Sequence, residues 1–453
     1  MMEEVDIKEI VENILYLADA KDEAMIRNII VGLYPVDLAE IIHHLNEENS
    51  NYIFSLLDAE TASDVISELD NISRDQIIDD LDEVRLSEIV DEMDSDDATD
   101  LVSDLPDEIA QKVLERIDKE DSEEVIELMT HEEDTAGGIM AKEFVAVNLQ
   151  STIDQAIQEI RAKSEEVEDI YYVYVVDDNN LLVGVVRLKD LILAKSNTTV
   201  SQIMIRDVVS VETTVDQEQV AKIARRYDLV AIPVVDKIGH LVGRITFDDV
   251  ADVMEEEASE DIQRMAGIAD EEEFRETSIL RISQVRLPWL LVGFAGQLVC
   301  AYILHYFEAS LNQIIATAFF IPIIMAMGGN SGIQSSTIMV RGMATGEIGL
   351  YDIKKRLFRE IFVSMLNGIT CGILLFLVVT FWLKQPKFGL ILSSVLVFVI
   401  LNASFIGALI PVVLKKINID PAIATGPFIT TSNDVLGLII YLGLITIFIP
   451  YLK

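Results

Sequence analysis

The stretch FFIPIIMAMGGNSGIQSSTIMV, residues 319–340, joins an apolar run to a cluster of glycines and polar side chains. An apolar run of about 20 residues is long enough to cross a hydrocarbon core of about 30 Å. Polar residues inside such a run are costly in lipid, so they indicate either a solute pathway or a close helix-packing interface. The stretch therefore predicts a membrane helix that lines a solute pathway or packs closely against another helix, rather than one that only anchors the chain.

Further apolar segments of similar length lie on both sides of this stretch. They leave no amphipathic face for water, which argues against a large buried core in a water-soluble protein. We therefore predict an all-α transmembrane domain of five helices over residues 284–453. The predicted spans are 287–306, 314–339, 358–383, 390–414 and 423–451.

Basic residues in the short loops predict the orientation of these spans, because such residues favour the cytoplasmic side. One side has Arg281, Arg286, Arg341, Lys354, Lys355, Arg356, Arg359, Lys415 and Lys416, and the other has Lys384, Lys387 and Lys453. The acidic N-terminus lacks the apolar core of a secretory signal. We expect a multi-pass protein of the plasma membrane with its N-terminus in the cytoplasm and its C-terminus outside.

The charge of the 453-residue chain is unevenly distributed. Its net charge is −43 although 51% of its residues are hydrophobic. Residues 1–276 contain 71 acidic and 22 basic residues, whereas residues 277–453 contain 6 and 12. This balance excludes nucleic acid as a partner of the first part and favours cations. The two cysteines lie in apolar runs and form neither a zinc quartet nor a disulfide framework.

A twelve-residue repeat runs through residues 37–129. Each unit has an apolar residue at one position and two more at three and four residues before it, so the three share one helical face. The common position is occupied by Leu45, Leu57, Leu69, Leu81, Met93, Leu105, Ile117 and Met129. The pattern predicts a superhelical stack of short helices, about eight residues each, in an acidic domain over residues 1–131. Its outward acids form a solvated face or, alternatively, a weak cation-sensing face.

Residues 139–255 contain a longer duplication, which predicts a domain pair over residues 132–255 with copies at about 137–198 and 199–255. Each copy is predicted to form strand, helix, strand, Asx or Gly turn, strand and helix. The segments IPVVD, 232–236, and LVGRITFDD, 241–249, resemble those of tandem cystathionine-β-synthase-type (CBS) domains. That resemblance implies an α/β pair that either serves as a dimer scaffold or binds ATP or another adenine nucleotide. Thr246 and Asp249 would then hold the ribose, whereas Arg187 replaces the usual Ser or Thr in the first copy.

An acidic connecting helix is predicted over residues 256–283. Within the membrane domain, Asp434 is the one acid well inside a predicted span, and Asp420 precedes the last span. Asp434 could be a structural acid paired with a neighbouring helix. The alternative is a cation site in a polar pore.

The order of these parts, with the Gly-Gly-Asn, Asp-Pro-Ala and Asp-x-x-Gly motifs, resembles the MgtE family of magnesium channels and transporters. The resemblance implies a homodimer in membrane lipid, with a pore between the subunits lined mainly by spans 2 and 5. Asp434 would hold hydrated Mg²⁺ in this pore, and Asp420 would lie at its cytosolic mouth. Mg²⁺ prefers oxygen ligands and loses water reluctantly, which suits carboxylates and carbonyls. The family often has Asn before Gln334, where this chain has Ile333.

The same resemblance implies regulatory metal sites at Asp216, Asp228, Asp249, Glu260 and Asp261. Cytosolic Mg²⁺ would bridge these acids and hold the pore closed, and their repulsion at low Mg²⁺ would release it. A carrier for Co²⁺ or Mn²⁺ is an alternative, and a membrane-anchored nucleotide sensor is a more distant one. We expect no enzyme: His131-Glu132 lacks the second histidine of a metalloprotease motif, and no P-loop is present.

Overall fold

The computed structural model describes residues 7–20, 22–164, 167, 170–268, 279–345, 348, 352–417, 419–424 and 426–452. The chain forms two compact units, Met1–Glu257 and Ala258–Lys453. The connecting helix predicted over residues 256–283 extends across 269–278, which lie outside the described residues. Lys453 lies outside them as well.

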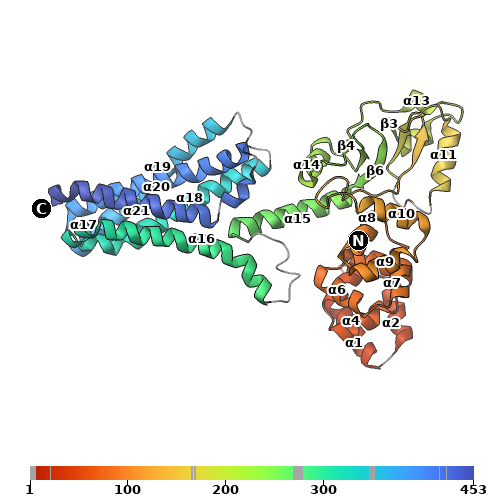
Figure 1. Ribbon diagram of the computed structural model, residues 1–453, viewed down its shortest axis with the longest axis horizontal. Helices are drawn as coiled ribbons and strands as arrows, with labels where there is room; N and C mark the ends of the chain where they lie inside the picture. Colours follow the sequence, from red (N-terminus) through yellow and green to blue (C-terminus); the bar gives the residue numbers. More distant parts are fainter. Residues whose placement is uncertain are drawn as a thin grey trace. The chain divides into compact units, whose positions relative to one another are not determined.

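The first unit begins with a series of short helices (Figure 1). These are α1 (Ile7–Ala20), α2 (Glu23–Ile30), α3 (Pro35–His43), α4 (Glu47–Phe54), α5 (Ala59–Glu68), α6 (Asn71–Asp80), α7 (Glu83–Val90), α8 (Ser95–Asp104), α9 (Asp107–Leu114) and α10 (Lys119–Leu128). Several start at an acid whose side chain accepts backbone N–H groups of the first turn, as Asp58, Asp70 and Asp82 do. Such caps satisfy donors that a helix start leaves unpaired.

The twelve-residue repeat is the unit of this stack. All eight residues at the position four before the repeated one are at most 2% exposed, from Ile41 to Val125. In three of the units the repeated residue is itself the extended C-cap of the helix: Leu69, Leu81 and Leu105. Alternate helices pack together, as in α3 with α5 and α5 with α7. The predicted superhelical stack is confirmed.

Two three-stranded sheets follow. In each, the first strand pairs parallel with the second, and the second pairs antiparallel with the third. The first copy comprises β1 (Ala146–Asn148), α11 (Ile153–Ala162), β2 (Tyr172–Val176), β3 (Leu182–Arg187) and α12 (Leu188–Leu193). The second comprises α13 (Val200–Ile203), β4 (Val211–Glu212), α14 (Gln217–Tyr227), β5 (Ala231–Val235), β6 (Leu241–Thr246) and α15 (Phe247–Ala266). This is the predicted order of elements in each copy.

The segment that precedes each sheet pairs with the edge strand of the sheet in the other copy. Ala141, before the first sheet, exchanges two backbone hydrogen bonds with Arg244 of β6, at 2.8 and 2.9 Å. Ile205, before the second sheet, does the same with Val185 of β3, at 2.8 and 3.0 Å. The sequence duplication therefore appears in space as a reciprocal exchange of edge segments.

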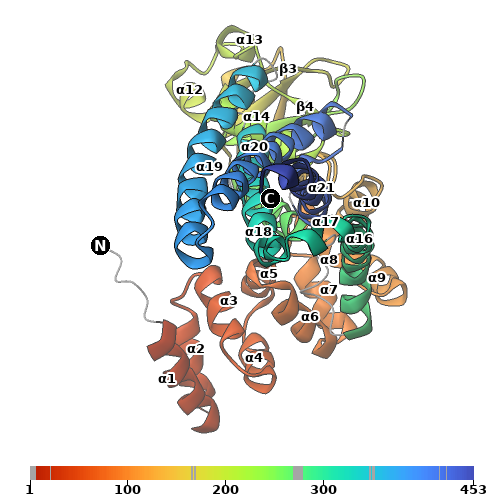
Figure 2. The same ribbon diagram turned by 90° about the vertical axis from the view of Figure 1, so that its left-hand side faces the viewer.

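The second unit contains the long apolar helices. Its elements are α16 (Ile279–Tyr306), α17 (Glu308–Gln313), α18 (Ala316–Ala344), α19 (Ile353–Leu383), α20 (Pro386–Lys416), the 3₁₀ helix η2 (Pro421–Ala424) and α21 (Pro427–Leu452). Five helices of the described chain are long and apolar enough to span a membrane. The predicted five-helix domain is confirmed. Figure 2 views this unit from its C-terminal end.

Helix packing in this unit centres on α20 and α21. Helices α18 and α19 pack against α20, and α16 and α18 pack against α21. The last helix begins four residues later than predicted, at Pro427, because residues 421–424 form η2 instead. Proline is well suited to the first position of a helix, where its missing N–H costs nothing. Asp420 therefore lies in a separate segment before α21.

Candidate functional site

Asp434 lies in the first third of α21 and is only partly exposed. Its Oδ2 atom accepts a hydrogen bond of 2.6 Å from Nε2 of Gln297 on α16. No Lys or Arg of the described residues pairs with this carboxylate. Gln297 is a site residue that sequence reasoning missed, although a polar side chain inside an apolar span was itself a signal.

The residue before it, Asn433, lies against the glycine-rich segment of α18. Asn433 is 3% exposed, and neither polar atom of its amide has a hydrogen-bond partner within the described residues. A Cβ atom at Gly332 would overlap Asn433 Nδ2. The glycine therefore gives room to the asparagine. Ile333, which replaces the family's usual Asn, is 38% exposed on the surface of this unit.

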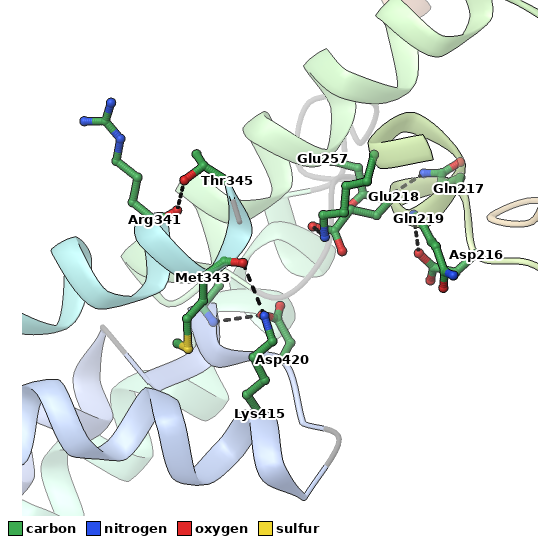
Figure 3. Close-up of polar contacts among 12 residues, drawn as sticks. Asp216, Gln217, Glu218, Gln219, Glu257, Arg341, Met343, Thr345, Lys415 and Asp420 are labelled. Carbon is green, nitrogen blue, oxygen red and sulfur yellow. Dashed lines mark hydrogen bonds and ion pairs between the residues drawn. The ribbon is translucent and has the colours of Figure 1, made fainter. Parts of the chain in front are cut away.

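Asp420 has two partners in the membrane unit. Its Oδ1 atom accepts the backbone N–H of Ala422 at 2.8 Å, and its Oδ2 atom accepts from Nη1 of Arg264 at 2.6 Å. Arg264, in the last turns of α15, also pairs with Glu260. Nearby, Lys415 Nζ donates to the carbonyl of Met343 at 3.2 Å (Figure 3). The acid predicted at the pore mouth is thus already neutralised by an arginine.

The other predicted regulatory acids have separate local roles. Asp216 caps α14 through the backbone N–H of Gln219, and the adjacent Gln217 donates to Glu257 at 3.1 Å (Figure 3). Asp228 is the exposed, left-handed C-cap of the same helix, with φ 51°. Asp261 follows Glu260 in α15. Within the described residues, no three or more His, Cys, Asp or Glu side chains form a group that could hold a metal ion.

Asp249, another of the predicted regulatory acids, lies close to several other acidic side chains. Its Oδ2 atom accepts from the backbone N–H and the hydroxyl of Thr246, at 2.8 and 2.6 Å. Burial nevertheless raises its pKa to about 6, with a further rise from Asp248 and Asp97. Loss of water disfavours the charged form of a carboxyl group, and neighbouring carboxylates act in the same direction.

The acids that face Asp249 come from α8, which sequence reasoning did not single out. Burial and the nearby Asp249 raise the pKa of Asp96 well above its usual range. Loss of water around the carboxyl group, together with the nearby Asp97, raises the pKa of Asp100 to about 7, although the side chain is partly exposed to solvent. Burial and neighbouring acids also raise the pKa of Asp252 and of Glu68.

These residues of α5, α8 and α15 form what we call the acidic cluster: Glu68, Asp96, Asp97, Asp100, Asp248, Asp249 and Asp252. Its members come from the helical stack and from the first turns of α15, within one compact unit. The charge of Arg74 offsets the repulsion among these carboxylates only in part, and a divalent cation would relieve the rest. The run DSDDATD, residues 94–100, was the available sequence signal.

Family comparisons cover most of the chain. Residues 321–444 match the model of a divalent cation transporter, MgtE, and residues 33–134 match the MgtE intracellular N domain. Residues 136–197 and 200–256 match the CBS domain.

Individual relatives extend this similarity. The chain is 37% identical over 322 residues to the magnesium transporter MgtE of Bacillus subtilis, covering 71% of each protein. It is 38% identical over 317 residues to the magnesium transporter MgtE of Thermus thermophilus, covering 70% of each. Among solved structures, the cytosolic domain of the Mg²⁺ channel MgtE in complex with ATP has a TM-score of 0.51 and 35% identity. That match covers 54% of this chain and 99% of the other.

Proposed function

Because the chain belongs to the MgtE family of divalent cation transporters, we propose that it is a Mg²⁺-selective channel or transporter for magnesium uptake. In this proposal cytosolic Mg²⁺ closes the pore by binding to acids of the helical stack, the CBS pair and the connecting helix. The protein is a multi-pass membrane protein. Its N-terminus lies in the cytoplasm and its C-terminus outside, as the basic loops favour.

One observation carries the transport proposal: Asp434 is a carboxylate within a membrane helix that no Lys or Arg of the described residues neutralises. Its hydrogen bond to Gln297 fixes one oxygen and leaves the other available. In a homodimer with the pore between its subunits, two such carboxylates would attract a hydrated Mg²⁺. The ion keeps much of its water shell, which an oxygen-lined pore accommodates.

The acidic cluster supports the regulatory half of the proposal. Its crowded carboxylates favour protonation, as the raised pKa values of Asp96, Asp100 and Asp249 indicate. A Mg²⁺ ion that keeps most of its water shell would relieve the same repulsion without three of the described acids converging on it. Mg²⁺ bound there would stabilise the arrangement of α8 against α15. If that arrangement belongs to the closed state, cytosolic Mg²⁺ shifts the population towards it.

The second CBS copy also has a candidate nucleotide site. Thr246 is buried, and its hydroxyl is held by Asp249 at the end of β6. The solved MgtE cytosolic domain named above contains ATP, which favours an adenine nucleotide as the ligand here. A nucleotide ribose would compete with the hydroxyl of Thr246 for Asp249, so nucleotide and Mg²⁺ would influence each other's binding.

Flux measurements on the purified full chain in proteoliposomes test the transport proposal. We expect Mg²⁺ entry that falls as Mg²⁺ on the cytosolic face rises through the millimolar range. Mg²⁺ entry that does not fall would contradict gating by cytosolic Mg²⁺ but would still support transport. Faster entry of Co²⁺ or Mn²⁺ than of Mg²⁺ would contradict the proposed Mg²⁺ selectivity and favour the alternative, a carrier for Co²⁺ or Mn²⁺.

A further inference from the structure

A polar cavity of about 170 Å³ lies among α18, α19 and α20 of the membrane unit. Its lining includes Ser335, Arg356, Arg359, Glu360, Asn367 and Ser404. It extends from the beginning of α19, where Arg356 and Arg359 lie at the basic end of the three helices, to the middle of α18, α19 and α20. Neither the Asp434 site nor the acidic cluster includes any of these residues.

The cavity has an unbalanced charge. Arg356 and Arg359 stand three residues apart on α19, and neither forms an ion pair with another residue that the structure describes. The single acid, Glu360, accepts a hydrogen bond of 2.7 Å from Ser335 Oγ. Two guanidinium groups and one carboxylate leave a net charge of +1, which one monoanion would neutralise. Arg356 is half-buried and Arg359 is exposed at the basic end of α19, where an anionic headgroup at the membrane surface could reach both.

The inner wall of the cavity is polar and the outside of its helix is apolar. Ser331 Oγ and Ser404 Oγ lie 2.6 Å apart on facing helices, and Ser404 is only 1% exposed. On the neighbouring surface of α19, Phe358, Phe362 and Leu366 are 66–70% exposed. A polar recess next to an exposed apolar surface has the geometry that a lipid headgroup and its acyl chains require.

We propose that this cavity binds the phosphodiester headgroup of an anionic phospholipid with a hydroxylated headgroup. Arg356 and Arg359 contact the phosphate oxygens, for which the planar guanidinium group is well suited. Glu360 and Asn367 accept hydrogen bonds from the headgroup hydroxyls. This inference goes beyond magnesium transport and requires only that the chain spans a membrane.

Lipid retention by the full chain in detergent, titrated with phosphatidylglycerol and followed by native mass spectrometry, tests the site. The double variant R356Q/R359Q should weaken phosphatidylglycerol binding roughly tenfold. The matched control K354Q/K355Q removes the same charge from the same helix outside the cavity, and should change binding less than roughly twofold. The R356K/R359K variant keeps the charge but loses the planar guanidinium groups, so its binding should lie between that of the wild type and that of R356Q/R359Q, which separates loss of charge from misfolding.

Four outcomes would overturn the proposal. Equal binding of phosphatidylcholine would remove the requirement for an anion, and displacement of the lipid by excess inorganic phosphate would indicate a free-anion site. An equal loss of phosphatidylglycerol binding in K354Q/K355Q would show that only general surface charge matters. Unchanged binding in R356Q/R359Q would exclude the cavity as the binding site. None of these outcomes depends on Mg²⁺ flux, so the lipid site and the transport proposal can fail separately.

Discussion

Arg264 and Asp420 form an ion pair in which Nη1 lies 2.6 Å from Oδ2. The pair connects the last turns of α15 to the segment before α21, within one compact unit. Both side chains are partly exposed, at 32% and 28%, so the pair contributes modestly to stability. Its position matters more, because it joins the last turns of α15 to the segment that precedes a proposed pore helix.

The variant Arg264→Gln should raise the cytosolic Mg²⁺ concentration needed for half-inhibition of flux. It removes a contact that holds α15 to the segment before α21, and so disfavours the closed state if that contact belongs to it. Dose-response curves in proteoliposomes measure the shift. Lys416→Gln, an exposed base near the same segment, is the control. An unchanged inhibition curve in Arg264→Gln would show that this ion pair takes no part in gating.

The variant Asp434→Asn should reduce Mg²⁺ flux to background while the protein still elutes as the wild type does. The amide keeps the shape of the side chain but loses the charge that attracts the cation. Gln297→Leu should reduce flux by roughly 10- to 100-fold, as loss of a residue that orients a metal ligand commonly does. Wild-type flux in Asp434→Asn would exclude Asp434 from the pathway.

The variant Gly332→Ala should destabilise the membrane unit by about 1–3 kcal/mol, because its Cβ would overlap Asn433. Gly329→Ala is the matched control: it lies on the same helix, and a Cβ there meets nothing within 4 Å. Thermal unfolding in detergent compares the two. Asn433→Ala in the Gly332→Ala background should restore part of the loss, and equal effects of both glycine variants would contradict the packing account.

Stability should depend on pH through the acidic cluster. The folded-state pKa values of Asp100 and Asp249, about 7 and about 6, exceed the ordinary value of 3.8. The folded chain therefore binds protons that the unfolded chain releases, and stability should fall as pH rises from roughly 4 to 7. Above this window the carboxylates are charged, so Mg²⁺ should raise the melting temperature more at pH 8 than at pH 5.

Replacement of cluster acids should remove this response. Asp96→Asn together with Asp100→Asn should stabilise the chain without Mg²⁺ and reduce its stabilisation by Mg²⁺. Asp79→Asn, which removes an exposed acid of α6 outside the cluster, should change neither. The melting temperature of the full chain, with and without Mg²⁺, distinguishes these cases. A full Mg²⁺ response in the double variant would place the sensor elsewhere.

Periodicity allowed the fold to be predicted. The twelve-residue repeat, the duplication of residues 139–255 and the five apolar runs each reflect burial of residues close together in the chain. The helix start at Pro427 and the short η2 were missed, because proline is compatible with several local structures. The residue boundaries of the domains remain a prediction.

Fewer residues of the candidate site could be predicted from the sequence. Asp434 stands out because an acid in an apolar span is rare, but its partner Gln297 lies 137 residues away and only packing of α16 against α21 identifies it. Likewise, the pairing of Arg264 with Asp420 spans 156 residues. The sequence left the outward acids of the repeat, including those of α8, as either a solvated face or a weak cation-sensing face, because a single sequence does not show that α15 lies near them. The metal-binding roles of all the predicted acids remain predictions: Asp434, Asp420, Asp216, Asp228, Asp249, Glu260 and Asp261.

The reciprocal exchange between the CBS copies limits how this part of the chain can be divided. Gly243 lies against Met140, and Gly184 lies against Met204, so each glycine leaves room for a side chain from the other copy. A cut near residue 199 would leave each half with an uncovered strand edge and an empty contact. The two copies should therefore unfold in one cooperative transition, and neither half should persist alone. The duplicated sequence thus encodes one indivisible structural unit rather than two independent domains.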